Sequence, residues 1–260
     1  MKDIVCVLLS AGIGSRLKPL TNELPKCLMP INGKPLLEIW LDTLQLLDIK
    51  KVLINLHYKK ELVIEFMKRP KFRDWVDTVY EADLLGTAGT LRQNYFYLKD
   101  KVILMVHADN LCICNFRKFL EYHINFRPKP ALMTMMTFHT ITPETCGIVE
   151  VDKKGIVWKF HEKVKNPPSN LANAAIYLLE PEILEWIMEQ ENISDFSTQV
   201  IPYFMGKIAT WKNDGIMRDI GNIESLKIAQ KEVQFDDYKI EDEWQKLYKS
   251  HPIHNLILQS

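Results

Sequence analysis

The sequence lacks an excess of charge of either sign. Among its 260 residues it has 33 lysines and arginines and 33 aspartates and glutamates, so the formal net charge is +0. This balance argues against a protein that coats nucleic acid, because such proteins carry a basic surplus. A protein that binds a nucleotide needs only local positive charge, so neutrality leaves that class open. Hydrophobic residues make up 47% of the chain, enough for a sizeable core.

Cysteine is scarce, and its spacing does not indicate a metal site. The five cysteines include Cys112 and Cys114, which are too close together for the usual zinc spacing. Cys6 lies in an apolar pattern and is expected to be a small core residue. Reduced thiols in a cytoplasmic protein are the simplest interpretation. The sequence also lacks a secretory signal and an apolar run of membrane-spanning length, so we expect no membrane contact.

Two familiar phosphate-binding loops are missing as well. No Walker string Gly-x-x-x-x-Gly-Lys-Ser/Thr occurs, and the dinucleotide fingerprint would need glycine or alanine where the chain has Leu17. Pro19 argues against a helix that opens directly from the loop. No internal repeat is present, which excludes an appended left-handed β-helix.

What the sequence has instead is one unusual stretch at residues 8–34. An apolar run at residues 3–9 leads into a glycine-rich loop at residues 10–14, and Arg16 and Lys26 follow. Glycines carry no Cβ, so backbone N–H groups can approach a ligand closely. An arginine can bind two phosphate oxygens at once, and a lysine can supply a point charge. The stretch favours a phosphate-binding loop over a plain strand-to-turn connection.

Strand-like and helix-like stretches alternate through the first half of the chain. We expect strands at residues 3–9, 51–56, 76–80, 101–106 and 130–138, with helices at residues 35–47, 59–68, 89–98 and 115–125. This alternation predicts an α/β fold, a Rossmann-like, mostly parallel mixed sheet with helices on both faces. Ligands of such sheets bind beyond the carboxyl ends of the strands, where the glycine-rich loop and residues 107–110 belong.

The pattern changes after residue 138. A hairpin with a glycine turn comes first, and further strands and helices follow it. We expect strands at residues 147–151, 156–160, 171–178 and 207–211, with helices at residues 181–190, 197–205 and 222–233. Residues 234–260 are charged and aromatic at first and then apolar, which predicts a C-terminal helical extension.

The order of residues in the glycine-rich stretch resembles the signature of the sugar-1-phosphate nucleotidylyltransferases. That signature reads Gly-x-Gly-x-Arg-(x)2-Pro-Leu-Thr-(x)n-Pro-Lys. Its positions are occupied by Gly12, Gly14, Arg16, Pro19, Leu20, Thr21, Pro25 and Lys26. Ile13 departs from the family, which usually has glycine or another small or aromatic residue there. The resemblance covers about residues 3–233, with six motifs in family order. It implies the nucleotide-diphospho-sugar transferase fold and a reaction of NTP with sugar 1-phosphate that gives NDP-sugar and pyrophosphate.

The resemblance also implies roles for individual residues. Arg16 and Lys26 would be catalytic, and Asp109 and Asp219 would hold Mg²⁺ as the cofactor. The nucleotide would contact the loop and a base-recognition segment, namely Leu9, Ala11, Gly12, Gly14, Ser15, Glu81, Gly86 and Thr87. The sugar phosphate would contact Gly147, Glu162, Lys163 and Asn173.

Some of these motifs have plain structural alternatives. Asp109 could lie in an ordinary turn, and residues 160–163 could be a charged strand end. Ala108 and Cys146 stand where the family usually has a glycine and an aromatic residue. Ala174 and Ala175 follow Asn173 at a place where glycine is common, so the fit of the sugar near this strand stays open.

The subfamily motifs look most like those of mannose-1-phosphate and heptose-phosphate guanylyltransferases, which favours GTP. Glu81 would read guanine, because a carboxylate accepts hydrogen bonds from both N1–H and the 2-amino group. Uridylyl and thymidylyl relatives often place a glutamine there. In the alternative, Glu81 caps the strand at residues 76–80 in solvent. A cytidylyl-, uridylyl- or thymidylyltransferase acting on a sugar phosphate or another small phosphorylated acceptor is the second candidate.

A candidate of a different class is a non-catalytic regulatory paralogue that binds NDP-sugar. The presence of Arg16, Lys26, Asp109 and Asp219 argues against it, because a dead paralogue has no need of a metal pair.

We predict one domain at residues 1–233, with a nucleotide-binding part at about 1–138 and a sugar-phosphate part at 139–233. Residues 234–260 are expected to pack or associate rather than enter the catalytic centre, and a homodimer is a possible assembly. The expected partners are the NTP and the sugar 1-phosphate, and neither nucleic acid nor a membrane. Arg16 and Lys26 lie in a loop and are expected to be solvated, so their removal should change stability little.

Overall fold

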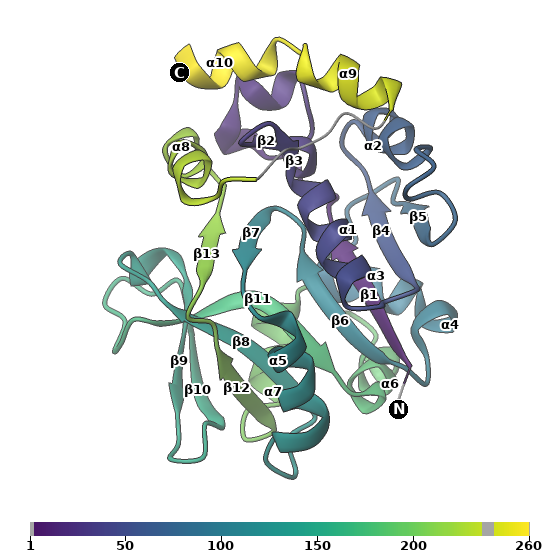
Figure 1. Cartoon of the computed structure of the whole chain (residues 1–260). Helices are drawn as coiled ribbons and strands as arrows, with labels where there is room; N and C mark the ends of the chain where they lie inside the picture. Colours follow the sequence, from purple (N-terminus) through teal and green to yellow (C-terminus); the bar gives the residue numbers. More distant parts are fainter. Residues whose placement is uncertain (1–2, 236–241, 260) are drawn as a thin grey trace. The chain divides into compact units, whose positions relative to one another are not determined.

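The structure, a computed structural model, describes residues 3–235 and 242–259. Its contacts divide these residues into two compact units, whose helices and strands are labelled in Figure 1. Unit 1 comprises the residues up to Val7, Leu85–Val106 and Ile113–Gly215. Unit 2 comprises Leu8–Leu84, His107–Cys112 and the residues from Ile216 onward. The predicted parts at 1–138, 139–233 and 234–260 follow function rather than contacts and stay a prediction.

Unit 1 is built on a mixed sheet. Its strands are β1 (Ile4–Leu9, which continues into unit 2), β6 (Val102–His107), β8 (Met133–His139), β9 (Gly147–Val151), β10 (Val157–Glu162), β11 (Leu171–Leu179) and β12 (Ile208–Lys212). β11 runs antiparallel to β6, β8 and β9, and β9 runs antiparallel to β10 in the predicted hairpin. β12 pairs in parallel with β8, along the edge of β8 that faces away from β11. The buried apolar side chains of β6, β8 and β11 form the core of this unit.

The register of the strands shows which side chains share a face of this sheet. Tyr177 of β11 lies opposite Met135 of β8, and Trp211 of β12 lies opposite Met136. Successive residues of a strand point to opposite faces, so Tyr177 and Trp211 lie on opposite faces of the sheet.

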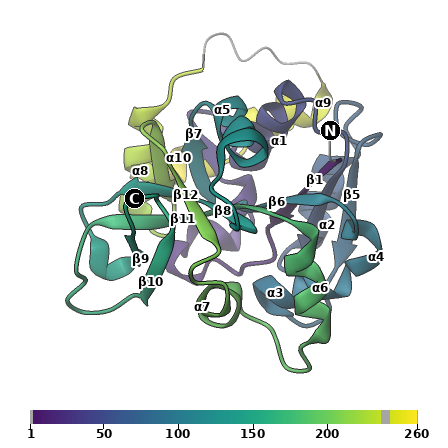
Figure 2. The same cartoon turned by 90° about the horizontal axis from the view of Figure 1, so that it is seen from below.

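Helices cover both faces. Phe119 of α5 (Phe116–Glu121) packs on Trp211, with ring centroids 5.4 Å apart. On the other face, Phe196 packs on Tyr177 at 5.0 Å and begins a π-helical turn that leads into α7 (Ile201–Tyr203). Figure 2 shows α5 and α7 on the two sides of β8 and β12. Unit 1 also contains α3 (Gly86–Gln93), α4 (Tyr95–Leu98) and α6 (Pro181–Glu189).

Unit 2 contains the parallel pair β4 (Val52–Leu56) and β5 (Val76–Tyr80), joined through α2 (Lys60–Met67). The glycine-rich loop leads into the 3₁₀ turns η1 (Ser15–Leu17), η2 (Leu20–Asn22) and η3 (Lys26–Leu28), followed by the hairpin β2 (Pro30–Ile31) and β3 (Lys34–Pro35) and by α1 (Leu36–Leu46). β7 (Asn110–Ile113) pairs with β13 (Ile216–Asp219). The unit ends in α8 (Ile223–Glu232), α9 (Glu243–Lys249) and α10 (Ile253–Gln259).

The predicted α/β fold with helices on both faces is confirmed, and most predicted elements are present. Asn115 and Asn222 cap α5 and α8, where their side chains accept hydrogen bonds from the N–H groups of Lys118 and Ser225. Cys6 is fully buried, as expected. In the part of the chain that the structure describes, no helix has the length and apolar character needed to cross a membrane.

Several element boundaries differ from the prediction. α1 begins at Leu36, because Pro35 belongs to the hairpin strand before it. The helix expected at residues 89–98 is two helices and begins earlier, at Gly86. The short strands β2, β3, β7 and β13 were not predicted, since two to four residues show no readable period.

One strand residue has an unfavourable backbone conformation that a substitution can relieve. Ala175 in β11 has a φ of 55°, which costs a residue with a Cβ roughly 1–2 kcal/mol. We expect Ala175→Gly to raise the free energy of unfolding by about 1 kcal/mol, measured by urea denaturation. The neighbouring Ala174→Gly is the control and should lower it by roughly 0.5–1 kcal/mol. Equal effects of the two substitutions would contradict the assignment of strain to Ala175.

Candidate active site

The glycine-rich loop packs directly against the segment that carries Lys26. Gly14 has a φ of 65°, and a Cβ at this position would lie 3.0 Å from Cγ2 of Thr21 and 3.3 Å from Cβ of Lys26. Thr21 also donates a hydrogen bond from Oγ1 to the carbonyl of Gly14, at 3.2 Å. The position therefore needs glycine both for its conformation and for this close approach.

Lys26 is buried between two carboxylates. Its Nζ donates to Oδ2 of Asp109 and to Oδ1 of Asp219, and each distance is 2.8 Å. Only 7% of the Lys26 side chain is exposed. The expectation of a solvated lysine is therefore wrong, because the loop folds back over the side chain instead of presenting it to water.

The charges in this cluster balance one another. Burial alone would lower the pKa of the Lys26 ammonium, but the charges and hydrogen bonds of Asp109 and Asp219 together outweigh burial and raise it. Burial would raise the pKa of Asp109, but Lys26 and His107 together lower it. Arg16 adds a second cation, with Nη2 at 3.8 Å from Oδ2 of Asp219. Its side chain is 73% exposed, as expected for a loop residue.

The two aspartates reach this cluster from strand ends. Asp109 lies in the turn between β6 and β7, and Asp219 is the last residue of β13, which pairs with β7. Gly221 follows at a point where a Cβ would lie 2.9 Å from Nη2 of Arg16 and 2.8 Å from Oδ2 of Asp219. A larger residue there would displace both charged groups.

A cavity of about 220 Å³ lies beside the cluster. The loop, the turn η3 and the two acidic motifs line it with Leu9, Ser10, Gly12, Gly14, Ser15, Arg16, Lys26, Cys27, Asp109 and Gly221. Whole small-molecule sites usually occupy roughly 300–1,000 Å³, so this space suits part of a ligand, such as a phosphate chain. The cavity brings together many of the predicted catalytic, nucleotide and metal residues. Ala11 of the same loop is buried, with 6% exposed.

Glu81 is connected to this loop through Asn55. The Nδ2 of Asn55 donates to Oε1 of Glu81 at 3.0 Å, and its Oδ1 accepts from the N–H of Ser10 at 2.7 Å. Glu81 is only 2% exposed, so the alternative in which it caps β5 in solvent is wrong. Sequence reasoning included Ser10 only as the first residue of the loop and missed Asn55. The available signal was a lone amide within the otherwise apolar run of β4.

The predicted sugar-phosphate residues lie in unit 1, on β9, β10 and β11. Gly147 is paired with Glu162, and a Cβ at Gly147 would lie 2.6 Å from the Phe160 ring, so this position requires glycine. Lys163 follows with a φ of 49°, a sparsely populated conformation that is often found at functional sites. Asn173 donates to the hydroxyl of Tyr177 at 2.5 Å, which fixes its amide.

Gly86 and Thr87, which were predicted to contact the nucleotide, also lie in unit 1. Gly86 has a φ of 77°, and a Cβ there would lie 2.5 Å from the carbonyl oxygen of Ser194. The Oγ1 of Thr87 accepts a hydrogen bond from the N–H of Phe196 at 2.7 Å. Both residues have a structural role at the start of α3, whatever ligand contact they make.

The carboxylates around Lys26 also fit a divalent cation. Asp109 and Asp219 converge on one cationic group, and carboxylate oxygens are the ligands that Mg²⁺ prefers. Within residues 3–235 and 242–259, no group of three or more His, Cys, Asp or Glu residues could hold a metal by itself. Mg²⁺ is commonly bound through one or two carboxylates together with substrate phosphates, so a pair is sufficient.

A comparison with protein families shows to which family the chain belongs. The model of the family described as nucleotidyl transferase matches residues 5–235. The chain belongs to the nucleotidyl transferase family. The recognition made from the glycine-rich signature is therefore confirmed, and the chain is an enzyme of the sugar-1-phosphate nucleotidylyltransferase type.

Relatives of this nucleotidyl transferase are distant in sequence. A Sulfolobus acidocaldarius protein proposed to be a mannose-1-phosphate guanyltransferase is 28% identical over 92% of this chain and 71% of its own length. A D-glycero-alpha-D-manno-heptose 1-phosphate guanylyltransferase from Aneurinibacillus thermoaerophilus is 27% identical over 88% and 97%. Other curated relatives are longer, and the chain spans 53% of a Methanocaldococcus jannaschii bifunctional GlmU and 60% of a Drosophila melanogaster mannose-1-phosphate guanylyltransferase catalytic subunit beta.

Solved structures share the fold of this nucleotidyl transferase. A Bacillus anthracis protein proposed to be a glucose-1-phosphate thymidylyltransferase, in complex with a sucrose, has a TM-score of 0.80 at 20% identity. The match covers 90% of this chain and 98% of that one. HddC from Yersinia pseudotuberculosis, complexed with GMP-PN, has a TM-score of 0.71 at 23% identity, with 89% and 99% covered.

The two cations of the site should differ in their effect on stability. Lys26→Ala leaves Asp109 and Asp219 facing each other without their shared donor, which we expect to lower the free energy of unfolding by about 1–3 kcal/mol. Arg16→Ala removes an exposed side chain and should change it by at most about 0.5 kcal/mol. Chemical denaturation of both variants measures the difference. Equal losses in the two would show that Lys26 is not held in the way described.

Proposed function

We propose that the chain joins an NTP and a sugar 1-phosphate to give NDP-sugar and pyrophosphate. The observation that carries this proposal is Lys26, held at 2.8 Å from both Asp109 and Asp219 beside a glycine-rich loop. Family membership supports the general reaction, and the cavity at the loop supports a phosphate ligand.

In the proposed reaction, an oxygen of the sugar phosphate attacks the α-phosphorus of the NTP in line. The new P–O bond forms as the bond to the β-phosphate breaks, and the electron pair leaves with pyrophosphate. No covalent enzyme intermediate is needed, because such transfers depend mainly on positioning and charge stabilisation.

Lys26 and Arg16 would supply the positive charge. A lysine ammonium has three donors, and the two aspartates accept from Lys26 along two directions, which leaves a third direction for a phosphate oxygen. The exposed guanidinium of Arg16 borders the cavity and would bind the triphosphate and stabilise the departing pyrophosphate. Backbone N–H groups of the glycine-rich loop, at Gly12 and Gly14, would bind the same anion.

Mg²⁺ is the cofactor that we propose for Asp109 and Asp219. When bound, it would neutralise phosphate charge and help to orient the triphosphate. The protein's own contribution is to hold both carboxylates at one position through Lys26.

The sugar phosphate would be bound by residues of unit 1. Lys163 would place its phosphate, and Glu162 and Asn173 would accept or donate hydrogen bonds to sugar hydroxyls. Gly147 would lie beside the ligand, and its lack of a Cβ leaves room for the Phe160 ring and the Glu162 carboxylate.

GTP is the nucleotide that we propose. The support is that several relatives are named guanylyltransferases and that the HddC structure holds GMP-PN. Glu81 would read the guanine edge, and its carboxylate orientation is fixed by Asn55. Cytidylyl, uridylyl or thymidylyl transfer is the second candidate, and the name of the Bacillus anthracis structure supports the thymidylyl case. The intact charged cluster argues against the regulatory paralogue.

Removal of either aspartate should abolish most of the activity. We expect turnover that requires Mg²⁺, and a loss of roughly 10²–10³-fold in kcat for Asp109→Ala and for Asp219→Ala. Pyrophosphate release, measured for four NTPs against a panel of sugar 1-phosphates, identifies the pair of substrates to use. Asp214→Ala is the control, because its side chain is 78% exposed and pairs only with Lys212 among the described ion pairs. Near-normal turnover of both site variants in EDTA would exclude the two-carboxylate metal site.

Substitution of Glu81 separates a base-reading role from a structural one. We expect wild type to prefer GTP, and Glu81→Gln to lower kcat/KM for GTP more than for UTP or dTTP, because an amide offers one acceptor instead of two. The measurement is kcat/KM for GTP, CTP, UTP and dTTP. Asp83→Asn changes an exposed carboxylate nearby and should leave the ranking unchanged. A uniform loss for all four nucleotides in Glu81→Gln would mean that Glu81 only anchors the loop through Asn55.

A further inference from the structure

The C-terminal helix α9 reaches the turn that carries Lys26. The hydroxyl of Tyr248 donates a hydrogen bond to the carbonyl oxygen of Leu28, and the distance is 2.6 Å. Both residues are buried, with Leu28 at 0% and Tyr248 at 4% exposed. Leu28 is the last residue of η3, the 3₁₀ turn that begins with Lys26. A residue beyond the family match therefore contacts the turn of a predicted catalytic residue.

The backbone of this turn makes few hydrogen bonds of its own. A 3₁₀ turn of three residues is held by few internal bonds, here Leu28 N–H to Pro25 at 2.9 Å and Met29 N–H to Lys26 at 3.1 Å. The carbonyl of Leu28 points out of the turn, and in a buried place it requires a donor. Tyr248 supplies this donor, and its loss would leave the carbonyl unsatisfied two residues from Lys26.

The segment just after the turn is also bound from the C-terminal side. Gln230 of α8 donates from Nε2 to the carbonyl of Pro30 and accepts at Oε1 from the N–H of Asn32, each at 2.5 Å. Asn32 in turn donates to the carbonyl of Val233 at 3.1 Å. Residues 28–32 are thus held by α8 and α9 together.

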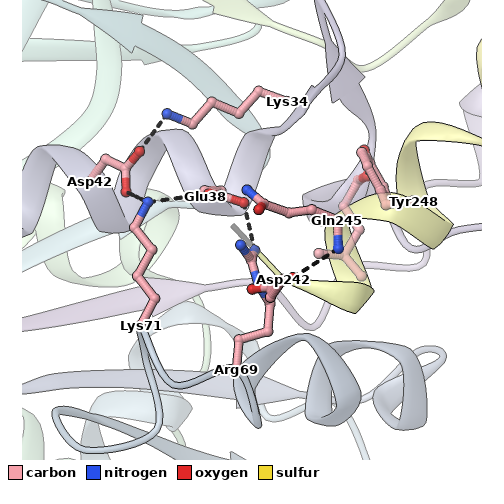
Figure 3. A network of polar contacts seen from close by, with 9 residues as sticks. Lys34, Glu38, Asp42, Arg69, Lys71, Asp242, Gln245 and Tyr248 are labelled. Atoms are coloured by element: carbon pink, nitrogen blue, oxygen red, sulfur yellow. Dashed lines mark hydrogen bonds and ion pairs between the residues drawn. The ribbon is translucent and has the colours of Figure 1, made fainter. Parts of the chain in front are cut away.

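A second set of contacts, separate from those of Tyr248, attaches α9 to the rest of unit 2. Asp242 caps the helix by accepting from the N–H of Gln245 and also binds Nε of Arg69 at 2.7 Å. The Nη1 of Arg69 lies 2.6 Å from Oε2 of Glu38, which is fully buried on α1. Figure 3 shows this network between α1, the segment after α2 and the start of α9, with Tyr248 on the far side of Gln245. A buried pair of this kind sets geometry more than it adds stability.

Contacts between aromatic rings also hold α9 in place. Trp244 stacks on Tyr248, with ring centroids 4.8 Å apart, and contacts Phe66 at 4.9 Å. The ring of Tyr248 is also in edge contact with His254 of α10, at 5.3 Å. The ring is therefore held by these neighbours, and its hydroxyl is directed at the Leu28 carbonyl.

We propose that Tyr248 is a positioning residue for Lys26, and that α9, which lies beyond the family match, braces the turn that carries Lys26. This inference rests on the proposed function, since it needs Lys26 to act on the substrate phosphate. Lys26 must meet two carboxylates and a phosphate at once, so a small shift of η3 lowers the rate before it unfolds the protein.

The test compares two variants of α9 that each remove one polar attachment. Tyr248→Phe keeps the ring and removes the hydroxyl, whereas Asp242→Asn weakens the contact with Arg69 and leaves the turn alone. Each should lower Tm by only a few degrees, about 2–4 °C. Steady-state kinetics should show kcat reduced roughly tenfold in Tyr248→Phe, with KM changed less than twofold, and both constants near wild type in Asp242→Asn.

The outcomes separate this inference from the proposed function. If wild type releases no pyrophosphate from any NTP and sugar 1-phosphate, the proposed function fails before the variants are compared. If wild type is active and Tyr248→Phe retains its kcat, the positioning role is excluded. An equal loss of kcat in both variants would assign the effect to general loosening of α9, and the role of the Tyr248 hydroxyl in positioning Lys26 would be overturned.

Lys26→Arg in the wild-type and Tyr248→Phe backgrounds adds a second readout. If Tyr248 acts through Lys26, the loss caused by the hydroxyl should nearly disappear once Lys26 is altered, because the two substitutions affect one group. Full additivity of the two losses would show that Tyr248 acts elsewhere.

Discussion

The contact of the Lys26 ammonium with Asp109 and Asp219 is the constraint on which the site depends. It joins three segments that are far apart in sequence, namely the turn η3, the end of β6 and the end of β13. A buried ammonium needs compensating charge, and the two carboxylates supply it. Conversely, the carboxylates stay close together because the lysine lies between them. With Arg16 beside Asp219, the cluster is neutral before an anion arrives.

Local motifs allowed much of this site to be predicted from the sequence. Gly12, Gly14, Arg16 and Lys26 lie close together in the sequence, so their spacing can be read directly from it. All four line the cavity. The alternation of strands and helices predicted the α/β fold for a similar reason, since periods of two and 3.6 residues are visible over five or more residues. Strands as short as β7 and β13 show no such period, so the pairing that places Asp219 was not foreseen.

What sequence reasoning missed depends on contacts between distant segments. Burial of Lys26 cannot be read from a loop rich in glycine and proline, which suggests exposure. Asn55 and Ser10 link the loop to Glu81 only once β4 is in place beside it. The functional division at residue 138 also differs from the division by contacts, because the chain passes repeatedly between the two units. Gly86 and Thr87 accordingly belong to one unit and Glu81 to the other.

The C-terminal helices show how a site within the family match can depend on a segment beyond that match. The family model ends at residue 235, whereas the donor for the Leu28 carbonyl comes from Tyr248. Any protein with this 3₁₀ turn must satisfy that carbonyl, but the requirement is for a donor and not for a particular residue or helix. Relatives of different length can meet it with different segments. The geometry of Lys26 can therefore be common to the family while the elements that enforce it differ between chains with different C-terminal extensions.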